Sequence, residues 1–324
     1  MLDIFLFLFS LLAGLSTMIV IQGLVLGITI PFLGVLIRYR ANYSPKRLQL
    51  AADDGAPTLT DHDEHGSPNS YLGMMKRVYN IEGWSGLYKG IMPSFISSFI
   101  AAVAVTPIAV FLTLDHRVLP GGRVSMHRDP QADTMLWTIL GFALSVLPVL
   151  LLIPMQIITN RAITTTHKLY PFAPKAALRV LLSPAERAHP LTLYLAPGVA
   201  LAETLQGLIP PAIRLLRLVA RPHMHLSTLP LLSAALPIIL LAAALFTPLQ
   251  VMATRLTLQR RGAAPDAEVD TPPAYADVME FRGTQEAPYT GLLDCGRQMV
   301  REEGWRVLFR AYWITLLGMG MMAL

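Results

Sequence analysis

The sequence is poor in charge and in cysteine. Charged residues make up 15% of the 324 positions and hydrophobic residues 53%, whereas an average soluble domain is about 25% charged. Because Cys295 is the one cysteine, no disulfide can form within the chain. The shortage of charge falls in long apolar stretches, which indicates that lipid surrounds much of the chain.

Motifs of enzymes and of nucleic-acid-binding proteins are also missing. The sequence has no zinc-ligand spacing, phosphate-binding loop or nucleophile elbow. Its net charge of +5 is not gathered on a recognisable nucleic-acid-binding module. We interpret His223 and His225 as part of a polar connector and not as metal ligands. We therefore expect no enzyme activity, no cofactor or metal, and no nucleic-acid partner; membrane lipids are the expected surroundings.

Apolar stretches that approach the length of a membrane-spanning helix, about 20 residues, occur six times. They cover about residues 4–37, 91–114, 134–160, 197–220, 228–254 and 307–324. The last of these predicts a short helix. The segments 51–68 and 262–288 are long for connecting loops and rich in acidic residues or in proline and alanine, so we interpret them as solvated, mobile insertions.

Three of the apolar stretches contain a proline followed seven residues later by an arginine. The pairs are Pro31 and Arg38, Pro154 and Arg161, and Pro248 and Arg255. A regular spacing of this kind predicts an internal repeat. We place the repeats at 1–117, 118–221 and 222–324, each with two membrane helices.

An acidic residue and an aromatic turn follow each proline–arginine pair. The turns read Glu82-Gly83-Trp84 then Leu87-Tyr88-Lys89-Gly90, Glu186 then Leu193-Tyr194-Leu195-Ala196, and Glu303-Gly304-Trp305 then Leu308-Phe309-Arg310-Ala311. Tryptophan and tyrosine suit a membrane interface. The amphipathic stretches 71–82, 172–183 and 289–302, which lead into the turns, are predicted to be short helices on the membrane surface.

The order of proline, arginine, Glu-Gly and Leu-Tyr-Lys-Gly resembles the signature of the mitochondrial carrier family. It is clearest at 71–93 and 289–311. The resemblance implies an all-α membrane protein with six tilted transmembrane helices in three pseudo-threefold repeats and short surface-parallel helices. It also implies a multi-pass protein of a mitochondrial membrane, and it leaves the inner and the outer membrane both open.

The sequence departs from the family at its gates. The family pattern has an acid two residues after each proline and a base five residues after it. Here those positions are the uncharged Leu33, Leu36, Gln156, Thr159, Gln250 and Ala253. Ion pairs in a low-dielectric pore attract strongly, and without them closure depends on packing and hydrogen bonds. At the opposite gate the first repeat offers only Leu114-Asp115-His116-Arg117.

The resemblance also implies substrate-contact positions, seven residues after the end of each aromatic turn. They fall on Ser97, Glu203 and Gly318, and Thr204 beside Glu203 is a further candidate. None is an arginine, so nucleotides and di- or tricarboxylates are poor substrate candidates. An ionisable residue in a membrane span is costly and marks a functional site by default. Glu203 is therefore either a cargo ligand or a carboxylate paired near the headgroups.

Two functions remain open at this point. One is the transport of a small neutral or cationic solute across a mitochondrial membrane by alternating access, which is what most proteins of this kind do. The other is a non-transporting scaffold of the mitochondrial outer membrane, engaged with other membrane proteins in fusion or lipid traffic. The uncharged gates favour the scaffold.

Overall fold

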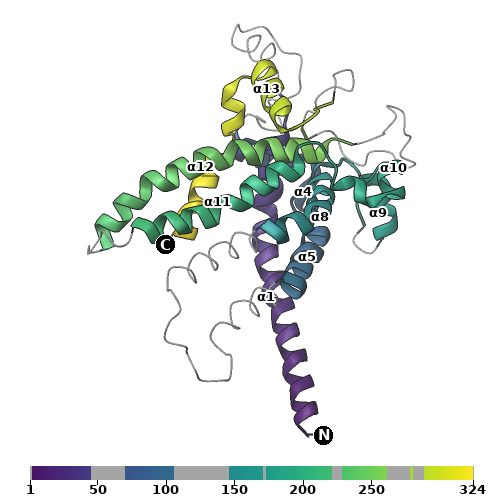
Figure 1. Cartoon of the computed structure of the whole chain (residues 1–324). Coiled ribbons are helices and arrows are strands. Elements are labelled where there is room, and N and C mark those ends of the chain that lie inside the picture. The colour runs from purple at the N-terminus through teal and green to yellow at the C-terminus, as the bar shows by residue number, and fades with distance from the viewer. Residues whose placement is uncertain are drawn as a thin grey trace.

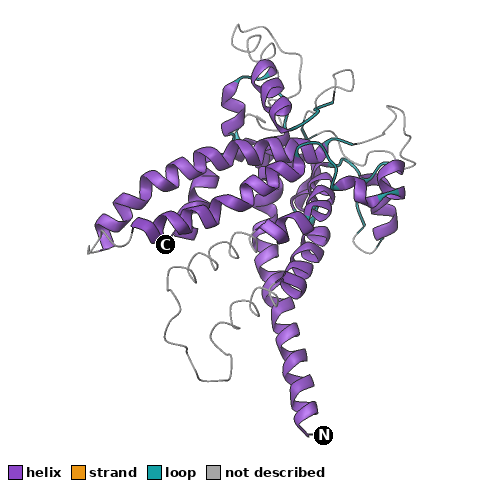
Figure 2. Cartoon of the chain, viewed as in Figure 1, coloured by secondary structure: helices purple, strands orange, loops and turns teal. Residues whose placement is uncertain are grey.

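Helices make up nearly all regular structure in the part of the chain that the structure describes. The computed structural model describes residues 2–44, 70–105, 146–170, 173–220, 228–260, 278–279 and 288–323. Within these ranges no strand is present (Figure 2). The predicted all-α class is therefore correct for the described residues. The segment 51–68, most of 262–288 and the opposite-gate residues 114–117 lie outside them.

Six helices overlap the predicted apolar stretches, some of them over only part of the predicted length. They are α1 (Leu2–Ala41), α5 (Ile91–Ile100), α8 (Ile153–Thr164), α11 (Val199–Ala220), α12 (Thr228–Leu258) and α14 (Tyr312–Ala323). The π-helical segment η1 (Ala101–Val105) continues α5. Pro31 lies inside α1 and Pro248 inside α12, whereas Pro154 occupies the first turn of α8, where a missing N–H costs nothing.

Short helices occupy the connections, as predicted. They are α4 (Tyr71–Leu87), α9 (Pro174–Leu181), α10 (Pro184–Ala188), η2 (Pro190–Leu193), α13 (Leu292–Glu302) and η4 (Trp305–Phe309). Local chemistry sets their ends: Ser70 caps α4, and Ser183 with Glu186 forms a capping box on α10. Gly83 interrupts α4 with a φ of 66°, which a glycine adopts without strain.

Fewer helices than predicted meet the length and hydropathy of a membrane span on their own. Among the described residues these are Ser16–Ala41 and Leu236–Leu258. The pair α4 and α5, bent by 50° at their junction, forms a third candidate if it counts as one span. The layout of six spanning helices therefore stays a prediction.

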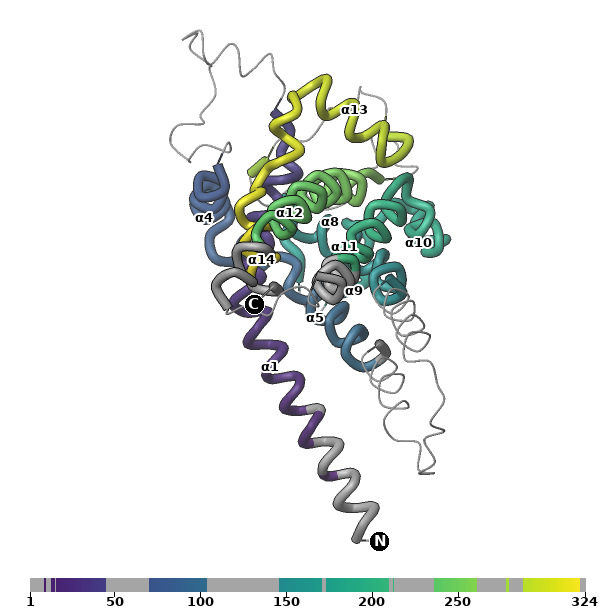
Figure 3. Tube along the Cα trace, turned by 60° about the vertical axis from the view of Figure 1, so that its left-hand side comes forward, coloured from purple at the N-terminus to yellow at the C-terminus, as the bar shows by residue number. Residues whose placement is uncertain are grey.

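The three proline-containing helices form the centre of the packing. Each of α1, α8 and α12 contacts both of the others. Between them, α5 contacts α1 and α8, and α11 contacts α8 and α12. In Figures 1 and 3 the N-terminal part of α1 extends away from the helices that pack on its C-terminal part. Exposed apolar side chains such as Phe9, Leu24 and Ile28 lie on this extension.

One type of ion pair occurs in all three segments. The arginine seven residues after each proline pairs with the glutamate before the aromatic turn. The pairs join Arg38 to Glu82 at 2.6 Å, Arg161 to Glu186 at 2.7 Å, and Arg255 to Glu303. All six side chains are buried. Burying a charge is costly unless it is paired and hydrogen-bonded, so each pair stabilises only as a unit.

The same arginines join consecutive segments into a closed ring. Each donates from Nε to a carbonyl in the last turn of the next proline-containing helix. The bonds run from Arg38 to Ile163 (3.0 Å), from Arg161 to Thr257 (3.0 Å) and from Arg255 to Arg40 (3.4 Å). Each acceptor lies two residues after the arginine of its own segment. Carbonyls at a helix C-terminus lack partners within the helix and favour a nearby cation.

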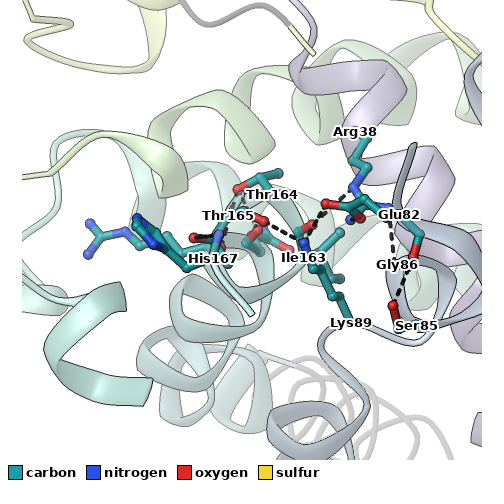
Figure 4. A network of polar contacts seen from close by, with 11 residues as sticks. Arg38, Glu82, Ser85, Gly86, Lys89, Ile163, Thr164, Thr165 and His167 are labelled. Carbon is teal, nitrogen blue, oxygen red and sulfur yellow. Dashed lines mark hydrogen bonds and ion pairs between the residues drawn. The ribbon is translucent and has the colours of Figure 1, made fainter. Parts of the chain in front are cut away.

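A second cation joins the ion pair in two of the three segments. Lys89 pairs with Glu82, as Figure 4 shows, and Arg310 approaches Glu303 at 3.5 Å. The corresponding position of the middle segment is Leu195. There Arg161 contacts both carboxylate oxygens of Glu186, at 2.7 and 3.0 Å, as Arg255 does with those of Glu303.

The ring predicts a specific order of stabilities for the middle segment. Arg161→Met leaves the Glu186 carboxylate buried without its main partner, and this should cost about 3–5 kcal/mol of stability. The double variant Arg161→Met with Glu186→Met removes both charges and should be more stable than the single variant. Melting curves of the purified protein in detergent check this, with Arg179→Met, at an exposed position of α9, as the control. Equal melting temperatures for the single variant and the control would contradict the prediction.

Candidate functional site

A cavity of about 470 Å³ lies between α1, α5, α8, α11 and α12. Small-molecule sites have volumes of roughly 300–1,000 Å³, so this cavity is large enough for a small solute. Its lining combines aliphatic side chains with serine, threonine and amide side chains. Two charged residues complete the lining, Glu203 from α11 and Arg40 from α1.

Glu203 is held by a glutamine from the neighbouring helix. Its side chain is buried, and Gln156 Nε2 on α8 donates to Glu203 Oε1 over 2.7 Å. This single hydrogen bond from a neutral group does not neutralise the carboxylate. A charge in such a place is expensive and is retained where it has a use.

Arg40 brings a positive charge to the same cavity. It lies in the last turn of α1, is 5% exposed, and donates from Nη2 to Thr315 Oγ1 on α14 over 2.9 Å. Thr315 in turn donates to Gln250 Oε1 over 3.2 Å. Arg40 is a site residue that the sequence analysis missed. The available signal was a second arginine within an apolar helix, two residues after Arg38.

Comparison with protein families gives one match. The family model described as mitochondrial carrier protein matches residues 225–324, which hold α12, α13 and α14. The match covers 100 of the 324 residues, and for this part of the chain it bears out the resemblance drawn from the motifs. A search of curated proteins found no matching sequence.

Most of the gate positions transferred from the carrier pattern line the cavity. They are Leu33, Gln156, Thr159, Gln250 and Ala253. Leu36 is instead buried in an apolar cluster with Met74 and Val78. The glutamines are already engaged, one with the Glu203 carboxylate and the other with the Thr315 hydroxyl, so the contacts at these positions are hydrogen bonds and not ion pairs.

The transferred contact positions divide in the same way. Ser97 and Glu203 line the cavity, whereas Thr204 and Gly318 do not. The Thr204 hydroxyl donates to the carbonyl of Ala200 in its own helix over 2.6 Å. Arg40, which is not one of the transferred positions, adds a positive charge to the lining from the last turn of α1.

Metal binding finds no support in the described ranges. No group of three or more histidine, cysteine, aspartate or glutamate side chains with metal-site geometry occurs among those residues. His223 and His225 lie outside them.

Glycine substitutions test where α14 and the aromatic turn lie relative to their neighbours. A Cβ added to Gly318 meets nothing within 4 Å, so Gly318→Ala should stabilise the carrier by up to about 1 kcal/mol through helix propensity. A Cβ added to Gly90, whose φ is 86°, would lie 2.6 Å from Ile163 Cγ1, so Gly90→Ala should destabilise it. Melting temperatures of the two variants check both signs, and a destabilising Gly318→Ala would contradict the placement of α14.

Proposed function

We propose that this protein is a carrier that moves a small neutral or cationic solute, chemically unchanged, across a mitochondrial membrane that it crosses several times. The observation that carries the proposal is the cavity between the proline-containing helices, with the Glu203 carboxylate exposed to it. A cavity of this kind serves no purpose in a packed core, because cavities lower the stability of the fold. The carrier-family match of residues 225–324 supports a transport role in general.

The gate chemistry agrees with a weakly closed carrier. At the gate level Gln156 donates to the Glu203 carboxylate and Gln250 accepts from Thr315, so neither contact is an ion pair. Hydrogen bonds of these two kinds contribute about 0.5–3 kcal/mol net, and breaking a buried ion pair costs about 3–5 kcal/mol. A solute that offers an equivalent hydrogen bond to Glu203 can therefore replace the contact with Gln156.

The scaffold remains the second candidate, because one observation favours it. None of the six gate positions carries a charge, so the charge-based switch expected of the family pattern is absent. A scaffold needs the ring of arginines and glutamates for its fold and has no need of Glu203. The two functions thus differ in what they require of this one carboxylate.

Glu203→Gln separates the two functions. If Glu203 binds cargo, the substitution should abolish uptake into liposomes, because the amide keeps the shape and removes the charge. Under either function it relieves a desolvation cost on the order of a few kcal/mol, so the folded protein should melt at the same temperature or higher, and a melting curve serves as the control for folding. Full rescue of a deletion strain by this variant would overturn the transport proposal.

The charge of the cavity also limits the cargo. Glu203 and Arg40 together give the lining no net charge, so a multiply charged anion would meet a single cation, Arg40, which the Glu203 carboxylate offsets. Reconstituted protein should therefore not exchange ADP or citrate above the level of empty liposomes. Exchange of either compound at a substantial rate would exclude a neutral or cationic cargo.

A further inference from the structure

The two charges of the cavity are both incompletely satisfied. Glu203 accepts from the amide of Gln156, and Arg40 donates to the hydroxyl of Thr315, so the partner of each charge is a neutral side chain. Glu203 and Arg40, both among the described residues, form no ion pair with each other. Each charge has therefore lost solvation without gaining an opposite charge, which costs several kcal/mol per ion.

Hydrogen bonds link the two charges to matching positions of α8 and α12. Gln156 and Gln250 each lie two residues after their proline, at equivalent places of α8 and α12. Gln156 contacts Glu203, and Gln250 is joined to Arg40 through Thr315. Side chains of a helix lean towards its N-terminus, so the long Arg40 side chain runs back from the last turn of α1 into the cavity.

Two hydrogen-bond donors in the same lining remain unused. Among the described residues, Arg40 Nε and Gln206 Nε2 are buried without a hydrogen-bond partner. Both residues line the cavity. Buried polar groups are nearly always bonded, and an exception indicates an absent ligand or water. Donors call for an acceptor, which a carboxylate supplies with two oxygens.

From this arrangement we infer that the cavity binds a small zwitterion, with its cationic group at Glu203 and its anionic group at the guanidinium of Arg40. The inference rests on the proposed transport function and narrows its substrate class. A zwitterion has no net charge, so it matches a lining with one charge of each sign. A free amine of the same length would leave Arg40 without a counter-charge, and a free acid would leave Glu203 without one.

The discrimination follows from the cost of an unpaired buried charge. A hydrogen bond to a charged group contributes about 1.5–3 kcal/mol, which corresponds to roughly ten- to a hundredfold in affinity. An amino acid should therefore bind at least tenfold more tightly than either its amine or its acid counterpart. Removing one of the two protein charges should abolish one of these two preferences and leave the other.

The experiment measures ligand-dependent melting of the purified full-length protein in detergent. The probes are glycine, β-alanine and γ-aminobutyrate, each compared with the amine that lacks its carboxylate and the acid that lacks its amine. A ligand that binds only the folded state raises the melting temperature, and the rise grows with the logarithm of the ligand concentration divided by its Kd. We compare wild type with Arg40→Gln, Glu203→Gln and the control Arg179→Gln, whose side chain is exposed on α9.

The expected result is reciprocal. In wild type and Arg179→Gln, at least one amino acid should bind tenfold or more tightly than its amine and its acid. Arg40→Gln should lose the preference over the amine but keep binding of the amine itself, and Glu203→Gln should lose the preference over the acid. Equal binding of amine and amino acid by wild type, unchanged in Arg40→Gln, would overturn the role of Arg40.

Failure of this inference is distinguishable from failure of the transport proposal. If amines bind and are exchanged by liposomes but amino acids have no advantage, the protein still transports a cation and only the zwitterion assignment is wrong. If no probe of any charge shifts the melting temperature and none is exchanged, both fail and the scaffold stands.

Discussion

The fold depends on one arrangement, a buried arginine that contacts two segments of the chain at once. Its fork holds a glutamate of its own segment, while Nε holds a helix-end carbonyl of the next segment. Because Arg38, Arg161 and Arg255 all do this, the contacts close on themselves and no segment is terminal in the ring. A planar guanidinium with five donors in fixed directions can make these contacts together, and a lysine cannot. The cavity lies next to this ring, with Arg40 belonging to both.

Much of the helical layout was predictable because its signals are local. Apolar length, prolines and the proline–arginine spacing lie within single stretches, so each predicted apolar stretch contains at least part of a helix and short helices lie in the connections. Which helices span the membrane was less predictable, because polar residues such as Glu203 in α11 lower the hydropathy by which a span is recognised.

The site was only partly predictable, because it depends on rotation and reach and not on spacing. Transferring a contact position by counting residues assumes that α5, α11 and α14 have the same rotation about their own axes relative to the cavity. This holds for Ser97 and Glu203, which line the cavity, and not for Gly318, which does not. The spacing pattern did not indicate Arg40, because a residue two positions after Arg38 lies on a different side of the helix. Its side chain reaches the cavity only by extending back along α1.

Compared with the family pattern, charge is missing from the gate positions and present at Glu203 and Arg40 in the cavity lining. In a pore closed by ion pairs, the electrostatic cost of opening lies at the gate and substrate binding offsets it. Here the gate positions themselves are uncharged, and the charges are Glu203 and Arg40, which line the same cavity and contact neutral side chains. A ligand of matching charge would pair with both without having to break an ion pair. A ligand shifts the equilibrium between two conformations only if it binds one of them more tightly. Here that requires a conformation in which the ligand contacts α1 and α11 together.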